Sequence, residues 1–178
     1  MTIVAAVDCG ATSVRVCRID LDAPGLVPEV VHRVPHAPVA DAAGHLRWDW
    51  QLITRAVEEG LERCLALGPL ASIGIDTWAV DYALLDSHGT LLAEPVAYRD
   101  GRTASAISRV DTLVSRREQF EINGLQHLPF ATLYQLEAEK SSDVWEQARH
   151  IVLLPDLLSY WLTGHLATER TNAGMSKP

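Results

Sequence analysis

A run of polar residues directly follows the first apolar segment of the chain. Residues 8–15 read Asp-Cys-Gly-Ala-Thr-Ser-Val-Arg. The glycine lets the backbone approach a ligand, successive N–H groups in such a turn can form an anion-binding concavity, and Arg15 can pair with phosphate. Asp8 supplies oxygen atoms of the kind that Mg²⁺ prefers. The octet suits either a phosphate site with a metal ion or an ordinary hairpin whose turn favours these residue types.

The second polar cluster lies in residues 72–82, Ser-Ile-Gly-Ile-Asp-Thr-Trp-Ala-Val-Asp-Tyr. A buried carboxylate such as Asp76 is costly unless it is paired or bound to a cation, so its place at the end of an apolar segment suggests a cleft. Trp78 offers an apolar platform for the face of a sugar, and Asp81 can accept hydrogen bonds from hydroxyl groups. A hairpin with its polar residues at the corner remains the alternative interpretation.

A third cluster, Tyr-Arg-Asp-Gly-Arg-Thr at residues 98–103, is typical of a surface charge network or a helix cap. His127 is expected to make a local hydrogen bond rather than to act as a base. The sequence contains no Walker A loop, no Gly-x-Gly-x-x-Gly, no Gly-x-Ser-x-Gly elbow and no His-Glu-x-x-His. The three cysteines have no Cys-x-x-Cys spacing, so we expect buried core thiols rather than a zinc site or disulfides.

Composition narrows the class of protein. The 178 residues are 48% hydrophobic and 21% charged, which indicates a globular chain of one domain or slightly more. The net charge of −8, without a basic stripe, argues against binding to nucleic acid or to an anionic membrane. No apolar stretch approaches the roughly 20 residues of a membrane span. We therefore expect a soluble protein of the cytoplasm.

Hydrophobic patterning predicts an α/β or mixed α+β protein. A helix is expected from Asp49, which can cap it, to Gly68-Pro69, which ends it. Three strands precede this helix and are expected to form an antiparallel meander. Later helices are expected near residues 107–114, 133–138 and 155–163. The expected strands are residues 3–7, 14–21, 30–34, 72–78, 80–85, 91–98 and 151–154.

Taken in order, these segments resemble the N-terminal part of the FGGY carbohydrate kinases, and within that family the rhamnulokinases. The resemblance runs along almost the whole chain. It rests on Ala-Val-Asp-x-Gly-Ala-x-Ser-x-Arg at 6–15, Arg-Trp-Asp at 47–49, Ser-Ile-Gly-Ile-Asp-Thr-Trp at 72–78, Val-Asp-Tyr at 80–82, Pro-Val-Ala-Tyr-Arg-Asp at 95–100, Leu-Pro-Phe at 128–130, Thr-Leu-Tyr-Gln-Leu at 132–136 and Leu-Pro-Asp-Leu-Leu-Ser-Tyr at 154–160.

The resemblance implies a ribonuclease-H-like, actin-type ATPase domain, with a second such domain across a deep cleft. It implies that ATP and Mg²⁺ are the cofactors, with Asp8 near the metal ion. The implied reaction transfers the γ-phosphate to O1 of L-rhamnulose. The implied ATP-binding residues are Ala11, Thr12, Ser13, Val14 and Arg15. The implied sugar-binding residues are Trp78, Ala79, Asp81 and Phe130.

Several features depart from the family pattern. The family usually has glycine at the positions of Val14 and Ala79. Its catalytic base lies in a His-Asp-Thr motif expected beyond residue 178, so residues 1–178 are expected to be an incomplete N-terminal domain without turnover, and 165–178 an irregular tail. The missing C-terminal half or self-association would then cover exposed apolar surface. Two alternatives remain open: a non-catalytic remnant or binding module, and a kinase of the same family for another ketose.

Overall fold

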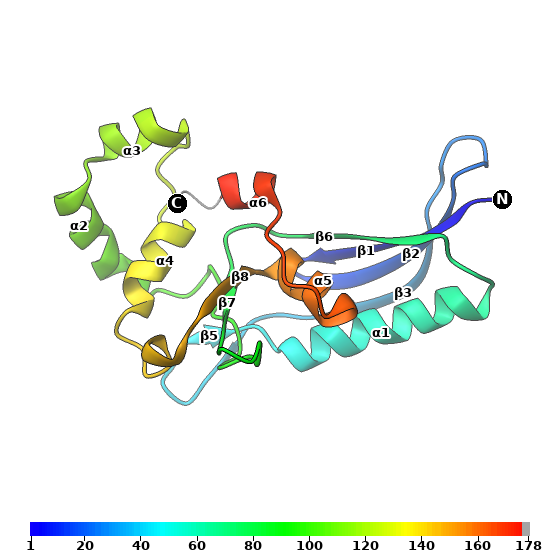
Figure 1. Cartoon of the computed structure of the whole chain (residues 1–178), viewed down its shortest axis with the longest axis horizontal. Coiled ribbons are helices and arrows are strands. Elements are labelled where there is room, and N and C mark those ends of the chain that lie inside the picture. The colour runs from blue at the N-terminus through cyan, green and yellow to red at the C-terminus, as the bar shows by residue number, and fades with distance from the viewer. Residues whose placement is uncertain (176–178) are drawn as a thin grey trace. The chain divides into compact units, whose positions relative to one another are not determined.

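The computed structural model describes residues 1–175 and is shown in Figure 1. The chain divides into two compact units. Unit 1 comprises Met1–Ala37 and Asp49–Trp78, and unit 2 comprises Pro38–Trp48 and Ala79–Pro178. Within the described residues, no helix is long and apolar enough to span a membrane.

Unit 1 is built on a four-stranded sheet. Strands β1, β2 and β3 form the antiparallel meander that the sequence predicts, and β6 pairs with β1 in parallel, which gives the order β3-β2-β1-β6. Odd-numbered residues of β1 are buried and even-numbered ones are half-buried, so the two faces of the sheet differ. The bounds are β1 Ile3–Gly10, β2 Ser13–Asp20, β3 Glu29–Pro35 and β6 Ser72–Thr77.

Helix α1 (Trp50–Ala66) covers one face of this sheet (Figure 1). The predicted cap is present, because the Asp49 carboxylate accepts a hydrogen bond of 2.9 Å from the Leu52 N–H. Gly60 brings the helix close to β2: a Cβ atom at this position would lie 2.3 Å from Cγ2 of Val16. Because α1 occupies one face, the half-buried residues of β1 lie on the other.

Unit 2 contains two small sheets. Strands β4 (Val39–Ala40) and β5 (Leu46–Arg47) pair antiparallel, as do β7 (Tyr82–Leu85) and β8 (His150–Leu153). Tyr82, Leu84 and Leu153 form a small core between β7 and β8. Helix α5 (Leu154–Thr163) follows β8 without a break, with proline in its first turn and Gly164 at φ 69° after its last.

The remaining helices of unit 2 are α2 (Thr103–Leu113), α3 (Arg116–Asn123) and α4 (Thr132–Glu139), with the 3₁₀ turn η1 (Trp145–Gln147) after them. Helix α2 packs on α4. Sequence patterning missed α3 because its residues are mostly polar. Its ends carry the usual signals, however: the Ser115 hydroxyl accepts from the Glu118 N–H, and Gly124 adopts φ 70°.

Two sequence predictions require correction. Residues 91–98 do not form a strand: they make only isolated bridges, Leu91 with Leu85 and Val96 with Arg47. The expected irregular tail contains helix α6 (Arg170–Met175), which begins where the Glu169 carboxylate accepts from the N–H groups of Thr171 and Asn172. Residues 176–178 of that tail lie outside the described residues.

Candidate active site

The turn between β1 and β2 carries the polar cluster of residues 8–15. Gly10 pairs with Ser13, which leaves Ala11 and Thr12 as a two-residue turn. Val14 is fully buried, opposite Cys9 on the face that α1 covers. Its side chain therefore points away from the open face, and the β-branched residue that replaces the family's usual glycine does not obstruct that face.

Asp8 and Arg15 are cross-strand partners on the open face, and their side chains form an ion pair. The parallel pairing of β1 with β6 places Asp76 directly beside Asp8, and the pairing of β2 with β3 places Arg33 beside Arg15. A row of two acidic and two basic residues thus crosses four strands in register. Such a row offers oxygen ligands to a cation and guanidinium groups to an anion.

A divalent cation fits the acidic end of this row. Within residues 1–175, no group of three or more His, Cys, Asp or Glu side chains is arranged to hold a metal ion. Mg²⁺ does not require such a group, because it is usually bound by one or two carboxylates together with waters and substrate phosphates. Burial and the neighbouring Asp8 charge raise the pKa of Cys9 to about 12, so its thiol is no competing ligand. The assignment of Asp8 to the metal stays a prediction.

His36 connects the turn to Trp78, and sequence reasoning missed it. One ring nitrogen, Nε2, lies 2.8 Å from the carbonyl oxygen of Gly10, and the ring centroid lies 5.7 Å from that of Trp78. Burial lowers the pKa of His36, which favours its neutral form. The His36 imidazole therefore contacts both the candidate phosphate turn, at Gly10, and Trp78, the predicted sugar-binding residue of unit 1.

In unit 2, the carboxylate of Asp81 is buried and accepts hydrogen bonds from protein donors. Its Oδ2 accepts from Nε1 of Trp48 at 2.7 Å and from the N–H of Tyr98 at 3.1 Å. Its Oδ1 accepts from Nε2 of Gln135 at 3.1 Å. Only 1% of Asp81 is exposed. This geometry suits a residue that holds its neighbours in place better than one that receives sugar hydroxyls.

Phe130 belongs to an aromatic group in unit 2. Its ring lies 5.6 Å from that of Tyr98 at an interplanar angle of 57°, and Tyr98 lies 6.4 Å from Trp48. The guanidinium of Arg99 lies over the Tyr98 ring, 5.4 Å from its centroid. Because Trp48 and the Tyr98 main chain also bond Asp81, the structure brings together two of the predicted sugar residues, Asp81 and Phe130, through this group.

The sequence model for the FGGY family of carbohydrate kinases, N-terminal domain, matches residues 3–177. The chain belongs to this family. It is similar to a rhamnulokinase from Klebsiella pneumoniae, with 40% identity over 174 residues that cover 94% of this chain and 35% of that protein. It is similar also to a rhamnulokinase from Bacillus subtilis, with 35% identity over 173 residues, 97% of this chain and 35% of that protein. The chain thus spans 35% of the length of each relative.

Solved kinases share the fold. A xylulose kinase from Rhodospirillum rubrum superposes with a TM-score of 0.85 at 17% identity, over 98% of this chain and 37% of that one. A ligand-bound xylulose kinase from Lactobacillus acidophilus superposes with a TM-score of 0.83 at 20% identity, over 99% of this chain and 36% of that one. At these identities the similarity establishes the fold alone. The predicted actin-type ATPase fold of an FGGY kinase N-terminal domain is confirmed.

In the Tyr-Arg-Asp-Gly-Arg-Thr segment of this FGGY chain, Asp100 and Thr103 are buried while Arg99 and Gly101 are exposed, so the segment is only partly the surface charge network that the sequence suggested. Arg102 forms an ion pair with Glu139, and the Tyr82 hydroxyl donates to the same carboxylate at 3.0 Å. Asp100 accepts from the N–H groups of Leu46 and Arg102 at 2.8 and 2.9 Å. Burial alone would raise the pKa of Asp100, but these hydrogen bonds outweigh it and hold the pKa below its ordinary value.

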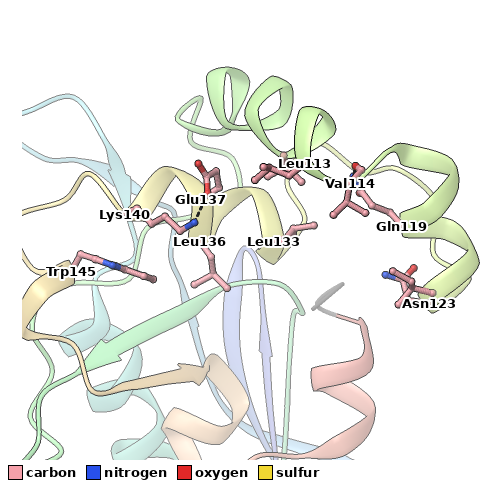
Figure 2. Close-up of a pocket in the computed structure, with 11 residues that line it drawn as sticks. Leu113, Val114, Gln119, Asn123, Leu133, Leu136, Glu137, Lys140 and Trp145 are labelled. Carbon is pink, nitrogen blue, oxygen red and sulfur yellow. Dashed lines mark hydrogen bonds and ion pairs between the residues drawn. The ribbon is translucent and has the colours of Figure 1, made fainter.

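A separate cavity of about 410 Å³ lies beside α2, α3 and α4 (Figure 2). Its lining is mainly apolar, with Leu133 and Leu136 from α4, and the Lys140 ammonium donates to Glu137 at its edge. None of the predicted ATP-, metal- or sugar-binding residues lines it. The cavity therefore provides no evidence for the predicted ATP, metal or sugar sites.

Proposed function

We propose that this FGGY chain is part of an ATP-dependent kinase that phosphorylates L-rhamnulose at O1. The observation that carries the choice of sugar is the 40% identity to a rhamnulokinase across 94% of the chain. Because the chain spans 35% of that relative, the activity of a whole enzyme is part of the proposal.

In this proposal, main-chain N–H groups of residues 11–15 and the Arg15 guanidinium bind the ATP phosphates. Asp8 holds Mg²⁺, which when bound neutralises charge on the transferred phosphoryl group. The Asp8–Arg15 ion pair supports both roles, because it keeps the two side chains on one face of the sheet before ligands arrive. The proton of the sugar hydroxyl is accepted by a base outside residues 1–178.

By the family resemblance, the sugar contacts are assigned to Trp78 of unit 1 and to Ala79 and Phe130 of unit 2. Trp78 and Phe130 are half-buried and offer aromatic surface, as a carbohydrate site requires. Asp81 is assigned an indirect role, because its oxygen atoms already accept three protein hydrogen bonds. The side chain of Val14 does not obstruct the phosphate turn, so this departure from the family's usual glycine is compatible with phosphate binding.

The test uses a chimera in which this chain replaces the matching N-terminal third of the Klebsiella pneumoniae rhamnulokinase. We expect ADP release with L-rhamnulose and ATP, and a much smaller kcat/KM with D-xylulose or L-fuculose. The 178-residue chain alone is expected to show no turnover. A folded chimera that phosphorylated another ketose better than L-rhamnulose would refute the assigned sugar.

Asp8→Asn in the same chimera tests the metal assignment. The change keeps the shape of the side chain and removes one negative charge, so kcat should fall by at least about 100-fold while the KM for sugar changes little. The ion pair with Arg15 is about 40% exposed, so stability should change by less than about 1 kcal/mol. The matched control is Asp20→Asn at the far end of β2. Near-normal kcat at saturating Mg·ATP would show that Asp8 does not serve the metal.

A further inference from the structure

Val80 has a backbone conformation that valine rarely adopts. Its φ angle is 74°, in the left-handed region, where a β-branched residue is a genuine outlier. Strained backbone of this kind persists only where the surroundings determine it, and it is concentrated at ligand sites and switches. Val80 lies between Ala79 and Asp81, two of the residues implied in sugar binding. Its conformation therefore decides how the main chain at Ala79 is presented.

Two side chains of helix α4 hold this conformation. The Thr132 hydroxyl donates to the carbonyl oxygen of Val80 at 2.7 Å, and Nε2 of Gln135 donates to the same oxygen at 3.2 Å. Both side chains are buried, and they are three residues apart, which places them on one face of the helix. Because two donors converge on one carbonyl, the peptide group after Val80 has a fixed orientation.

Gln135 also makes hydrogen bonds to Asp81 and Phe130. Its Nε2 also lies 3.1 Å from Oδ1 of Asp81 and 3.0 Å from the carbonyl oxygen of Phe130. Its Oε1 accepts from Arg102 at 3.2 Å, which fixes the orientation of the amide group. One side chain thus connects the Val80 turn, Asp81 and Phe130.

We propose that Thr132 and Gln135 are positioning residues for the sugar: they keep Val80 at positive φ, so that Ala79 and Phe130 are held in a conformation competent to bind. This inference rests on the proposed function. If one donor is removed, Val80 spends part of its time at negative φ. The apparent dissociation constant then rises in inverse proportion to the remaining competent fraction. Glycine at position 80 adopts positive φ freely and should make the donors unnecessary.

The experiment measures L-rhamnulose binding to the 178-residue chain by calorimetry. Thr132→Val keeps the size of the side chain and removes the donor, so the dissociation constant should rise about fivefold, the equivalent of one hydrogen bond. Thr132→Ser, which keeps the hydroxyl, should bind as the unaltered chain does. The double variant Val80→Gly/Thr132→Val should return to within about twofold of the unaltered chain. Gln135→Met removes the other donor and provides a second variant.

The matched control is Thr163→Val, which also removes a threonine hydroxyl that donates to a main-chain carbonyl at 2.7 Å, but at the end of α5. It should leave binding unchanged. Equal affinity for Thr132→Val and the unaltered chain, or no recovery with Val80→Gly, would overturn the inference. If the unaltered chain bound no L-rhamnulose, the chimera would provide the test of the proposed sugar. The ¹³Cα and ¹³Cβ shifts of residue 80 would still decide the inference, since a positive-φ signature that persists in Thr132→Val would refute it.

Discussion

Asp81→Asn separates two roles for the carboxylate that the sequence assigns to sugar binding. If Asp81 holds Trp48, Tyr98 and Gln135 in place, the substitution should destabilise the protein. If Asp81 mainly received sugar hydroxyls, the substitution should weaken binding and leave stability nearly unchanged. The two expectations differ enough in free energy to be measured.

The magnitude follows from the three hydrogen bonds. Asparagine can keep its carbonyl oxygen towards Trp48 Nε1 and the Tyr98 N–H, but its amide NH₂ then faces the NH₂ of Gln135. Gln135 cannot turn over without losing its bonds to Val80 and Arg102. One hydrogen bond is lost in a buried site, where two NH₂ groups then face each other. The free energy of unfolding should therefore fall by about 3 kcal/mol.

The assay is urea unfolding monitored by tryptophan fluorescence, with circular dichroism as a second probe. A loss of about 3 kcal/mol leaves a typical domain folded, because its total stability is about 5–15 kcal/mol. The matched control is Asp86→Asn, whose carboxylate accepts two main-chain N–H groups in an exposed turn. Its effect should be clearly smaller. An unchanged urea midpoint for Asp81→Asn would refute the holding role.

Three further outcomes test other parts of the structure. Gly60→Ala should lower stability by about 1–3 kcal/mol in urea unfolding, although alanine is the better helix former, because the new Cβ meets Val16; a stabilised variant would contradict the close packing of α1 on β2. Hydrogen bonds from Arg47 and from main-chain N–H groups lower the pKa of Asp41 from 3.8 to about 2. The Asp41 carboxylate therefore contributes its full stabilisation above the unfolded pKa of 3.8, and this stabilisation disappears as the pH falls through the folded pKa of about 2. Asp41→Asn should therefore reduce the loss of thermal stability between about pH 5 and pH 2, and an unchanged pH profile would contradict this. All three cysteines are buried, so a thiol reagent at pH 8 should label none in the folded chain and three in urea, and fast labelling of the folded chain would contradict their burial.

The sequence predicted best those elements that depend on local pattern. The alternation in β1 and the cap and stop signals of α1 are properties of adjacent residues, and both elements appear as expected. Residues 91–98 misled the prediction because they are apolar enough for a strand, yet only isolated residues find partners across a sheet. Pairing depends on what lies alongside, and a single segment does not contain that information.

In the candidate site too, the sequence indicates the residue types but not the partners that each side chain contacts. The sequence placed Asp8 and Arg15 in one turn, and the cross-strand register brings them together as a pair. For Asp81, the sequence could supply only a carboxylate near a tryptophan. Its donors are Trp48, 33 positions earlier, and Gln135, 54 positions later, so no local pattern shows that its oxygen atoms are occupied.

The buried network also explains why a strained valine is tolerated at position 80. A positive φ costs about 1–3 kcal/mol for a residue other than glycine, while each hydrogen bond of a folded protein contributes about 1 kcal/mol. The two donors on the Val80 carbonyl offset most of that cost. Neither donor could be recognised in advance, because Thr132 and Gln135 read as ordinary helix residues in the sequence. The conformation of the turn is therefore set by helix α4, more than 50 residues away, and changes in α4 should alter sugar binding without touching the sugar.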